Sequence, residues 1–138
     1  MKRITAIALF IIAAFITTGR AVAQDRAVRA TVPFDFTVGD KLLPSGTYTI
    51  TSASADIIVI KNYDRRIAIL STATPDSKES RNGSKLVFDK YGDQYFLHEI
   101  LCQSAALNVN LPTSKQEKKA RVQEAMLHSA GQVFVAAR

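Results

Sequence analysis

The sequence predicts a mainly β protein: an antiparallel β-sandwich, or a small barrel, of about seven or eight strands with one C-terminal helix. Segments of strand length either alternate apolar and polar residues or are apolar throughout. Turn residues separate these segments roughly every ten positions, a spacing typical of sandwiches and small barrels. After Pro112 the alternation gives way to helix-forming residues. Of the two architectures, we prefer the sandwich.

Residues 1–23 are predicted to form a cleavable export signal. Two basic residues open the segment, an apolar stretch follows over residues 4–16, and Ala21-Val22-Ala23 is a small-residue cleavage site. The apolar stretch is shorter than the roughly 20 residues that a transmembrane helix needs. We therefore expect a periplasmic or secreted protein with no transmembrane span after signal cleavage, and a single β-rich domain over residues 24–138.

Composition limits the partners of this domain. The whole chain has a formal net charge of +6, but three basic residues leave with the signal, so that 15 basic and 12 acidic residues remain, a net +3. This excess is too small and too dispersed for a nucleic-acid binder, and we expect no nucleic acid as partner. Tryptophan, the side chain best suited to stacking on sugar rings, is absent.

The first expected strand is the alternating segment 28–38. Pro33 cannot donate a hydrogen bond to a neighbouring strand, so we expect a sheet edge, a bulge or a break at this point. Turn signals then flank Leu42-Leu43, and a β-rich segment follows over residues 46–51. Its alternation puts Tyr48 and Ile50 on one face.

Two hairpins are expected next. Residues 56–60 and 66–71 contain the continuous apolar runs 57–60 and 67–70, which suggests burial on two faces or one face covered by another layer. The polar segment 74–84 is expected to be a surface loop and the most mobile part of the domain. The second hairpin joins residues 85–89 to 94–101, with Gly92 at the positive φ of the turn. A further alternating strand follows, with three inward side chains: Leu107, Val109 and Leu111.

The helix is expected at about residues 114–129. Ser114 and Glu117 have the spacing of a capping box. A partial apolar stripe follows, formed by Val122, Ala125 and Met126. Gly131 is expected to end the helix, and residues 132–136 to form a last strand.

No metal, cofactor or catalytic site is predicted. His98 and Glu99 are adjacent on a strand and should point to opposite faces, while His128 lies far along the chain. A hydrolase could be assembled from a serine, His98 and either Asp89 or Asp93, but the chain has no Gly-x-Ser-x-Gly motif. We therefore expect no enzyme.

Cys102 is the only cysteine, so a disulfide within the chain is impossible. Burial as a small apolar residue is the preferred interpretation, and a disulfide-linked dimer is the alternative.

Four basic residues are concentrated on the expected helix: Lys115, Lys118, Lys119 and Arg121. Such a patch is commonly just a solvated helix face. The functional alternative is an interaction surface for anionic lipid headgroups or an acidic partner. The apolar side of the helix is too rich in alanine for a typical membrane-inserting helix.

Several segments resemble a family of small exported bacterial proteins that have a β-domain and no assigned catalytic residues. The resemblance lies in Val32-Pro33-Phe34-Asp35-Phe36-Thr37-Val38-Gly39, Leu43-Pro44-Ser45-Gly46-Thr47-Tyr48, Tyr91-Gly92-Asp93-Gln94-Tyr95-Phe96-Leu97 and Leu111-Pro112-Thr113-Ser114-Lys115. It covers most of the chain after the signal and implies a common fold and an exported location. The second of these segments is also similar to a turn and strand of prealbumin-like sandwich modules.

Together these features predict an exported, non-catalytic binding or structural module that is envelope-associated or secreted. Its partner would be a protein or an envelope polymer. One alternative is a carrier that holds a small apolar ligand in a β-barrel pocket. Another is a small hydrolase, which would need His98 in a cleft with a carboxylate or hydroxyl within hydrogen-bond reach.

Overall fold

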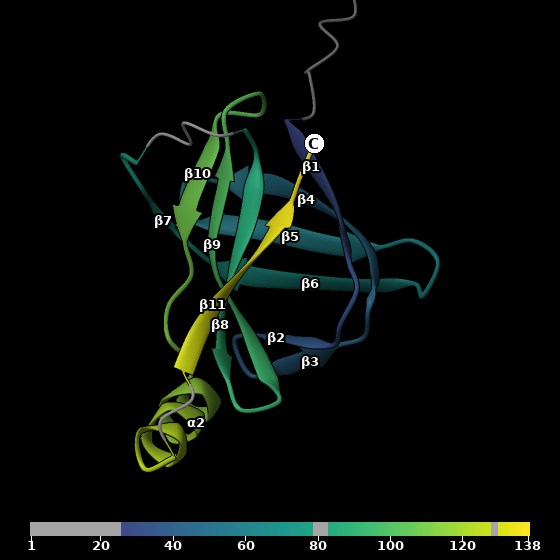
Figure 1. The fold of residues 1–138 in the computed structure, drawn as a ribbon. Helices are drawn as coiled ribbons and strands as arrows, with labels where there is room; N and C mark the ends of the chain where they lie inside the picture. Colours follow the sequence, from purple (N-terminus) through teal and green to yellow (C-terminus); the bar gives the residue numbers. More distant parts are fainter. Residues whose placement is uncertain (1–25, 79–82, 128–129) are drawn as a thin grey trace, which may run out of the picture.

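The fold is mainly β, as expected, with two mostly antiparallel sheets and a single C-terminal helix (Figure 1). The computed structural model describes residues 26–78, 83–127 and 130–138, so the expected signal segment lies outside the described residues. The elements are β1 (Ala27–Val32), β2 (Phe36–Val38), β3 (Lys41–Leu43), β4 (Gly46–Ser54), β5 (Ile57–Asn62), β6 (Ile67–Thr72), β7 (Thr74–Pro75), β8 (Lys85–Tyr91), β9 (Gln94–Cys102), β10 (Leu107–Asn110), α2 (Lys115–Ala125) and β11 (Ala130–Ala136).

The first sheet has the strand order β1-β4-β5-β6, and all its pairs are antiparallel. The second has the order β11-β8-β9-β10-β7, and the short β2–β3 pair joins it through a single parallel pairing of Thr37 with Phe96. Hairpin turns connect most neighbours, so much of the order follows from local turn chemistry. The position of β11 at the sheet edge beside β8 does not follow from a local turn, because β9, β10 and α2 lie between the two strands in the sequence.

The chain end joins the two sheets along one side. Ala30 of β1 forms an isolated bridge with Ala137, just beyond β11. In the neighbouring residue pair the Arg29 N–H donates to the Arg138 carbonyl at 2.7 Å, and the Arg138 N–H donates to the Arg29 carbonyl at 2.9 Å. These contacts satisfy part of the β1 edge and curl the strands into a half-barrel (Figure 1).

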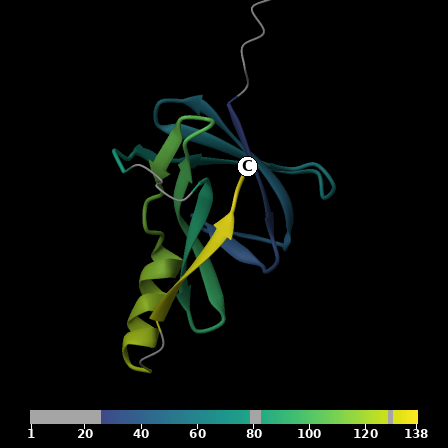
Figure 2. The same ribbon diagram turned by 45° about the horizontal axis from the view of Figure 1, so that its top comes forward.

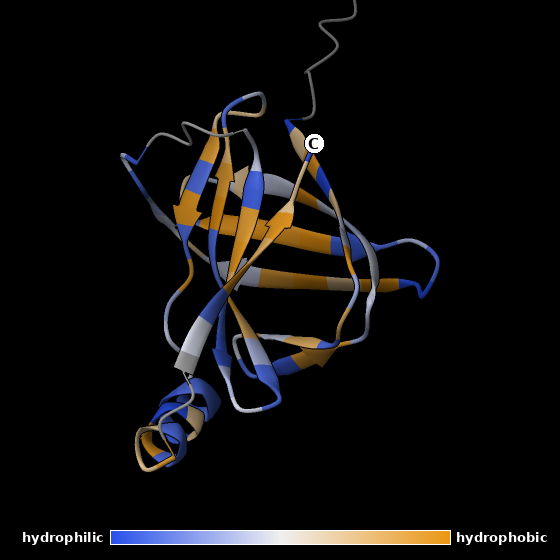
Figure 3. Cartoon of the chain, in the orientation of Figure 1, coloured by the Kyte–Doolittle hydropathy of each residue, from blue (hydrophilic) through white to orange (hydrophobic). Residues whose placement is uncertain are grey.

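Aromatic and branched side chains fill the space between the sheets. Phe36 packs edge to face on both Tyr48 and Phe88, with ring centroids 5.1 and 5.3 Å apart. Isoleucines from β4 and β5 complete this layer: Ile50, Ile58 and Ile60. Figure 3 shows the apolar residues concentrated on these strands, while α2 is mostly hydrophilic. The expected burial of Tyr48 and Ile50 on one face is confirmed.

Several sequence predictions are confirmed at the level of single elements. The first expected strand breaks after Val32, as Pro33 predicts, and continues as β2. Both hairpins form, with Gly92 in the second turn at φ +60°. Three further residues face inward as expected: Leu107, Val109 and Leu111.

For the apolar β5–β6 hairpin the second alternative holds: one face is covered by the other sheet, and Leu70 on the outer face is 71% exposed. Three predictions are wrong. The described residues contain eleven strands rather than seven or eight, because short pairs such as β2–β3 and β7–β10 also form ladders. The expected loop 74–84 begins with β7, and its residues 79–82 lie outside the described residues.

The third correction concerns the helix. It ends at Ala125, where the Met126 N–H donates to the Gln123 carbonyl, and not at Gly131. Gly131 instead pairs with Lys90 within β11, because β11 begins earlier than expected. Within the described ranges no helix has the length and apolar character needed to cross a membrane.

Candidate functional site

Asp89 and His98 meet on one face of the β8–β9 hairpin. Asp89 pairs with Phe96, so His98, two residues further along β9, points to the same side. The register shifts between Val87 and Phe88, directly across from His98, and such a bulge redirects a side chain. The His98 Nδ1 and the Asp89 Oδ2 end 3.5 Å apart.

The adjacent Glu99 has different partners. Its carboxylate accepts a hydrogen bond from the Lys78 Nζ at 3.5 Å. His98 and Glu99 thus do not share a site, in agreement with their adjacency on a strand.

Helix α2 brings a third side chain, Glu117, to this pair. The Ser114 Oγ accepts a hydrogen bond from the Glu117 N–H at 3.1 Å, so the expected N-cap is confirmed. Glu117 is only 5% exposed. One donor atom each from Asp89, His98 and Glu117 lie within 4.8 Å of one another.

Burial raises the pKa of the Glu117 carboxyl, and the charge of Asp89 raises it further. Three groups lower the pKa of Glu117 but do not cancel the rise: the Ser114 N–H, His98 and Arg121. Tyr91 responds to the same charges: burial first, then Asp89 and Glu117, raise the pKa of its hydroxyl. The cluster therefore concentrates negative charge around a buried Glu117, beside a His98 side chain that is 37% exposed.

The His98 Nδ1 is buried and has no hydrogen-bond partner among the described residues. Its neighbour Asp89 is held from the other side, because the Asp89 Oδ1 accepts a hydrogen bond from the Gln132 Nε2 at 3.2 Å. Buried nitrogens without a partner are rare in folded proteins, and each one requires an explanation.

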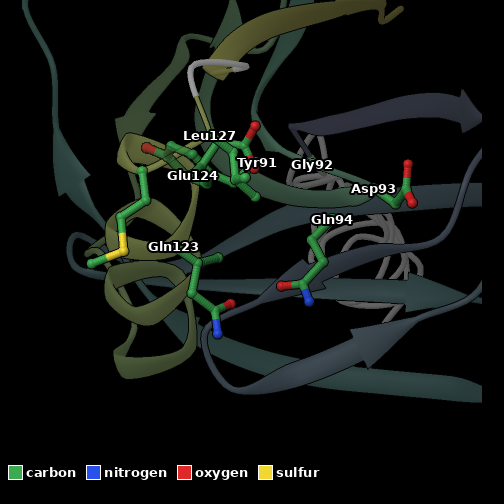
Figure 4. A pocket seen from close by; sticks show the side chains of 9 residues that line it. Tyr91, Gly92, Asp93, Gln94, Gln123, Glu124 and Leu127 are labelled. Atoms are coloured by element: carbon green, nitrogen blue, oxygen red, sulfur yellow. The ribbon is translucent and has the colours of Figure 1, made fainter.

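A surface pocket of about 530 Å³ lies beside the cluster, between α2 and the β8–β9 turn (Figure 4). Gln123 and Glu124 of α2 line one side, and Asp93 and Gln94 of the turn line the other. Gly92 allows the helix to come close, since a Cβ on it would lie 3.2 Å from the Glu124 Oε2. Asp93, considered with Asp89 as a partner of His98, is exposed and belongs to this pocket instead.

The exposed surface of α2 carries the basic residues singled out in the sequence. All four are exposed: Lys115, Lys118, Lys119 and Arg121. In the described part of the chain none of them forms a salt bridge. Arg121 still acts on Glu117 electrostatically.

The apolar stripe of α2 faces solvent, not the sheet. Val122 is 59% exposed and Met126 is 78% exposed. The residues that the helix buries are two glutamates and an alanine: Glu117, Ala120 and Glu124. The helix thus lies at one end of the second sheet, beside β8 and β11 (Figure 2). Its two buried carboxylates are turned inward.

Cys102 is fully buried, as the sequence interpretation preferred, and forms no disulfide. The Ser84 and Ser104 hydroxyls lie 3.1 and 3.3 Å from its Sγ. Burial raises the pKa of the thiol, but hydrogen bonds from the two serines and from backbone N–H groups outweigh it, so the pKa lies below its ordinary value.

Sequence reasoning considered Asp89 and His98 only as parts of a hydrolase and did not connect them with Glu117. Their proximity could have been found by counting outward from the turn at Gly92, because paired residues in a hairpin are symmetric about the turn. Glu117 gave only the capping signal. Its approach to the hairpin depends on how α2 docks.

No family model matches the chain, and the comparisons with curated proteins and with solved structures find no match.

Proposed function

We propose that this protein is an exported, non-catalytic binding module that attaches to an anionic membrane surface through the outer face of α2. One observation supports this most directly: the helix buries its two inner glutamates and exposes its lysines together with Val122 and Met126. The outward face is therefore both basic and apolar.

The helical repeat explains this separation. At 3.6 residues per turn, Lys115, Lys119 and Val122 share one side of the helix, and Met126 extends the same row. Glu117 and Glu124 lie on the opposite side and face the sheet. A face of this composition suits attachment to an anionic membrane surface mainly through its charges, since the helix is too rich in alanine to insert deeply.

The expected membrane affinity is modest. Each lysine close to an anionic lipid surface contributes about 1 kcal/mol, so three lysines contribute about 3 kcal/mol. This corresponds to roughly a hundredfold preference for an anionic over a neutral surface. The two apolar side chains add to it if they insert. We expect reversible attachment that weakens with salt.

Export and the absence of catalysis are the other parts of the proposal. Export is supported by the signal-like segment 1–23. The likeness to the family of small exported bacterial β-domain proteins is consistent with the same location. The hydrolase alternative has an orienting carboxylate in Asp89, but among the described residues no hydroxyl donates a hydrogen bond to His98. The carrier alternative gains no support, because Phe36, Tyr48 and Phe88 pack on one another in the interior.

Vesicle flotation tests the proposal. The purified exported protein should float with vesicles of phosphatidylcholine and phosphatidylglycerol, and much less with phosphatidylcholine alone. Replacing Lys115, Lys118 and Lys119 by glutamine should abolish the difference. The charge-matched control replaces three exposed basic residues on other elements, Arg26, Lys41 and Arg65, and should retain it.

Two results would contradict the proposal. In one, both triple variants lose vesicle binding equally, which would show a dependence on net charge rather than on α2. In the other, the protein binds soluble polyglutamate but no vesicle, and the surface would then be assigned to an acidic polymer.

A further inference from the structure

Three side chains from three elements converge at the base of α2. Asp89 comes from β8, His98 from β9 and Glu117 from the first turn of the helix. Their nearest donor atoms lie within 4.8 Å of one another. Ligands of a tetrahedral zinc ion are about 3.5 Å apart, given bond lengths near 2.0–2.2 Å. Small side-chain rotations would therefore bring the three atoms around one ion.

The buried His98 Nδ1 is a second, independent observation that points to a ligand. When the His98 Nδ1 carries no proton, it needs a donor or a cation, because Asp89 and Glu117 offer only acceptors when they are ionised. The 3.5 Å gap to the Asp89 Oδ2 also exceeds the 2.7–2.9 Å usual for a charge-assisted hydrogen bond. A metal ion between these atoms would give both the His98 Nδ1 and the Asp89 carboxylate a partner.

We propose that Asp89, His98 and Glu117 bind a divalent transition-metal ion, with zinc as the best fit. One imidazole and two carboxylates suit zinc and its neighbours, whereas calcium and magnesium are bound by oxygen ligands. Three protein ligands leave a fourth position for water. Gln132 supplies the outer contact that orients Asp89.

The surrounding charges favour a cation. The carboxylates of Asp89 and Glu117 each place a donor atom within 4.8 Å of the other, and Glu117 is only 5% exposed. A divalent ion would neutralise both carboxylates and recover the energy lost by burying them close together.

The ion would fasten α2 to the hairpin. The helix otherwise buries only Glu117, Ala120 and Glu124, a poor apolar contact for an element of its length. The chain has a single cysteine and so cannot use an internal disulfide for this purpose. A metal bridge is a common way to hold a small domain together.

Calorimetric titration of zinc into the full exported protein tests the proposal. The protein is purified without a polyhistidine tag and freed of metal with a chelator. One zinc ion per chain should bind, and cobalt in its place should give the visible absorption of a site with nitrogen and oxygen ligands. His98→Asn and Glu117→Gln should each weaken zinc binding by at least about tenfold, since even outer contacts are worth 10- to 100-fold.

Matched variants separate the site from general effects. His128→Asn removes the other histidine, and Glu124→Gln removes the other buried glutamate of α2; both should bind zinc as the parent does. Gln at position 117 still completes a capping box, so the helix should persist by circular dichroism. The proposal is overturned if folded parent protein binds no zinc, or if the His98 and Glu117 variants bind it unchanged.

Discussion

Gly46 and Asn62 are so close that a Cβ on the glycine would lie 2.8 Å from the Asn62 Nδ2. Asn62 is 2% exposed, and its Oδ1 accepts a hydrogen bond from the Arg65 N–H at 3.0 Å. The side chain therefore cannot move aside without losing that bond. Gly46 begins β4 and Asn62 ends β5, so this contact fixes how the two strands approach at the end of the first sheet.

Gly46→Ala should destabilise the protein by about 1–3 kcal/mol, the usual cost of inserting an atom into a packed place. Urea unfolding followed by circular dichroism measures the change. Gly39→Ala is the matched control, because Gly39 also has a positive φ, at +61°, but a Cβ there meets nothing within 4 Å. Equal losses in both variants would show that the Asn62 contact is not responsible.

Val122→Ser and Met126→Ser should each change the free energy of unfolding by less than about 0.5 kcal/mol, because both side chains are exposed. Ile60→Ala, at a fully buried position of β5, should cost about 2–5 kcal/mol. Thermal unfolding compares the three. A large loss at Val122 would mean that the helix docks through its apolar stripe after all.

The ionisation of Asp76 should make the stability of the fold depend on pH. The Lys78 N–H is the main group that lowers the pKa of Asp76 below its ordinary value near 3.8, with Glu99, Asn110 and the Lys78 charge helping and burial opposing. A lowered pKa in the folded state stabilises the fold above the ordinary pKa, and this contribution is lost as the pH falls through the folded value.

The free energy of unfolding of the parent should fall as the pH drops below about 4. In Asp76→Asn this fall should be smaller, because the variant has no carboxylate to protonate at this position. Urea unfolding at pH 3, 4 and 6 measures this. Asp40→Asn, at an exposed turn position, should leave the fall unchanged. Parallel curves for the parent and the Asp76 variant would contradict the prediction.

Cys102 should react with a thiol reagent only when the protein unfolds, because it is fully buried beneath Ser84 and Ser104. The labelling should be slow in buffer without urea. As urea is added, the labelling rate should rise in parallel with the fraction of unfolded protein. Gels without reductant should show monomer only. Rapid labelling of folded protein would contradict the burial, and a dimer band in the gel without reductant would show the disulfide-linked form.

The local sequence was sufficient to predict much of the fold. Alternation over a few residues placed Tyr48 and Ile50 in the core, and Pro33 and Gly92 marked a break and a turn through their own backbone geometry. Ser114 and Glu117 likewise predicted the start of the helix. These signals depend on neighbours in the chain, so a single sequence contains them.

Only the tertiary structure decided which distant segments contact one another and which side of the helix faces solvent. The bridge between Ala30 and Ala137, and the approach of Glu117 to Asp89 and His98, join segments far apart in the chain. The stripe of Val122 and Met126 indicated an apolar face, yet the helix turned it to solvent. A short helix with a weak stripe has no strong preference of its own, so its contacts with β8 and β11 set its rotation and, with it, both proposed sites.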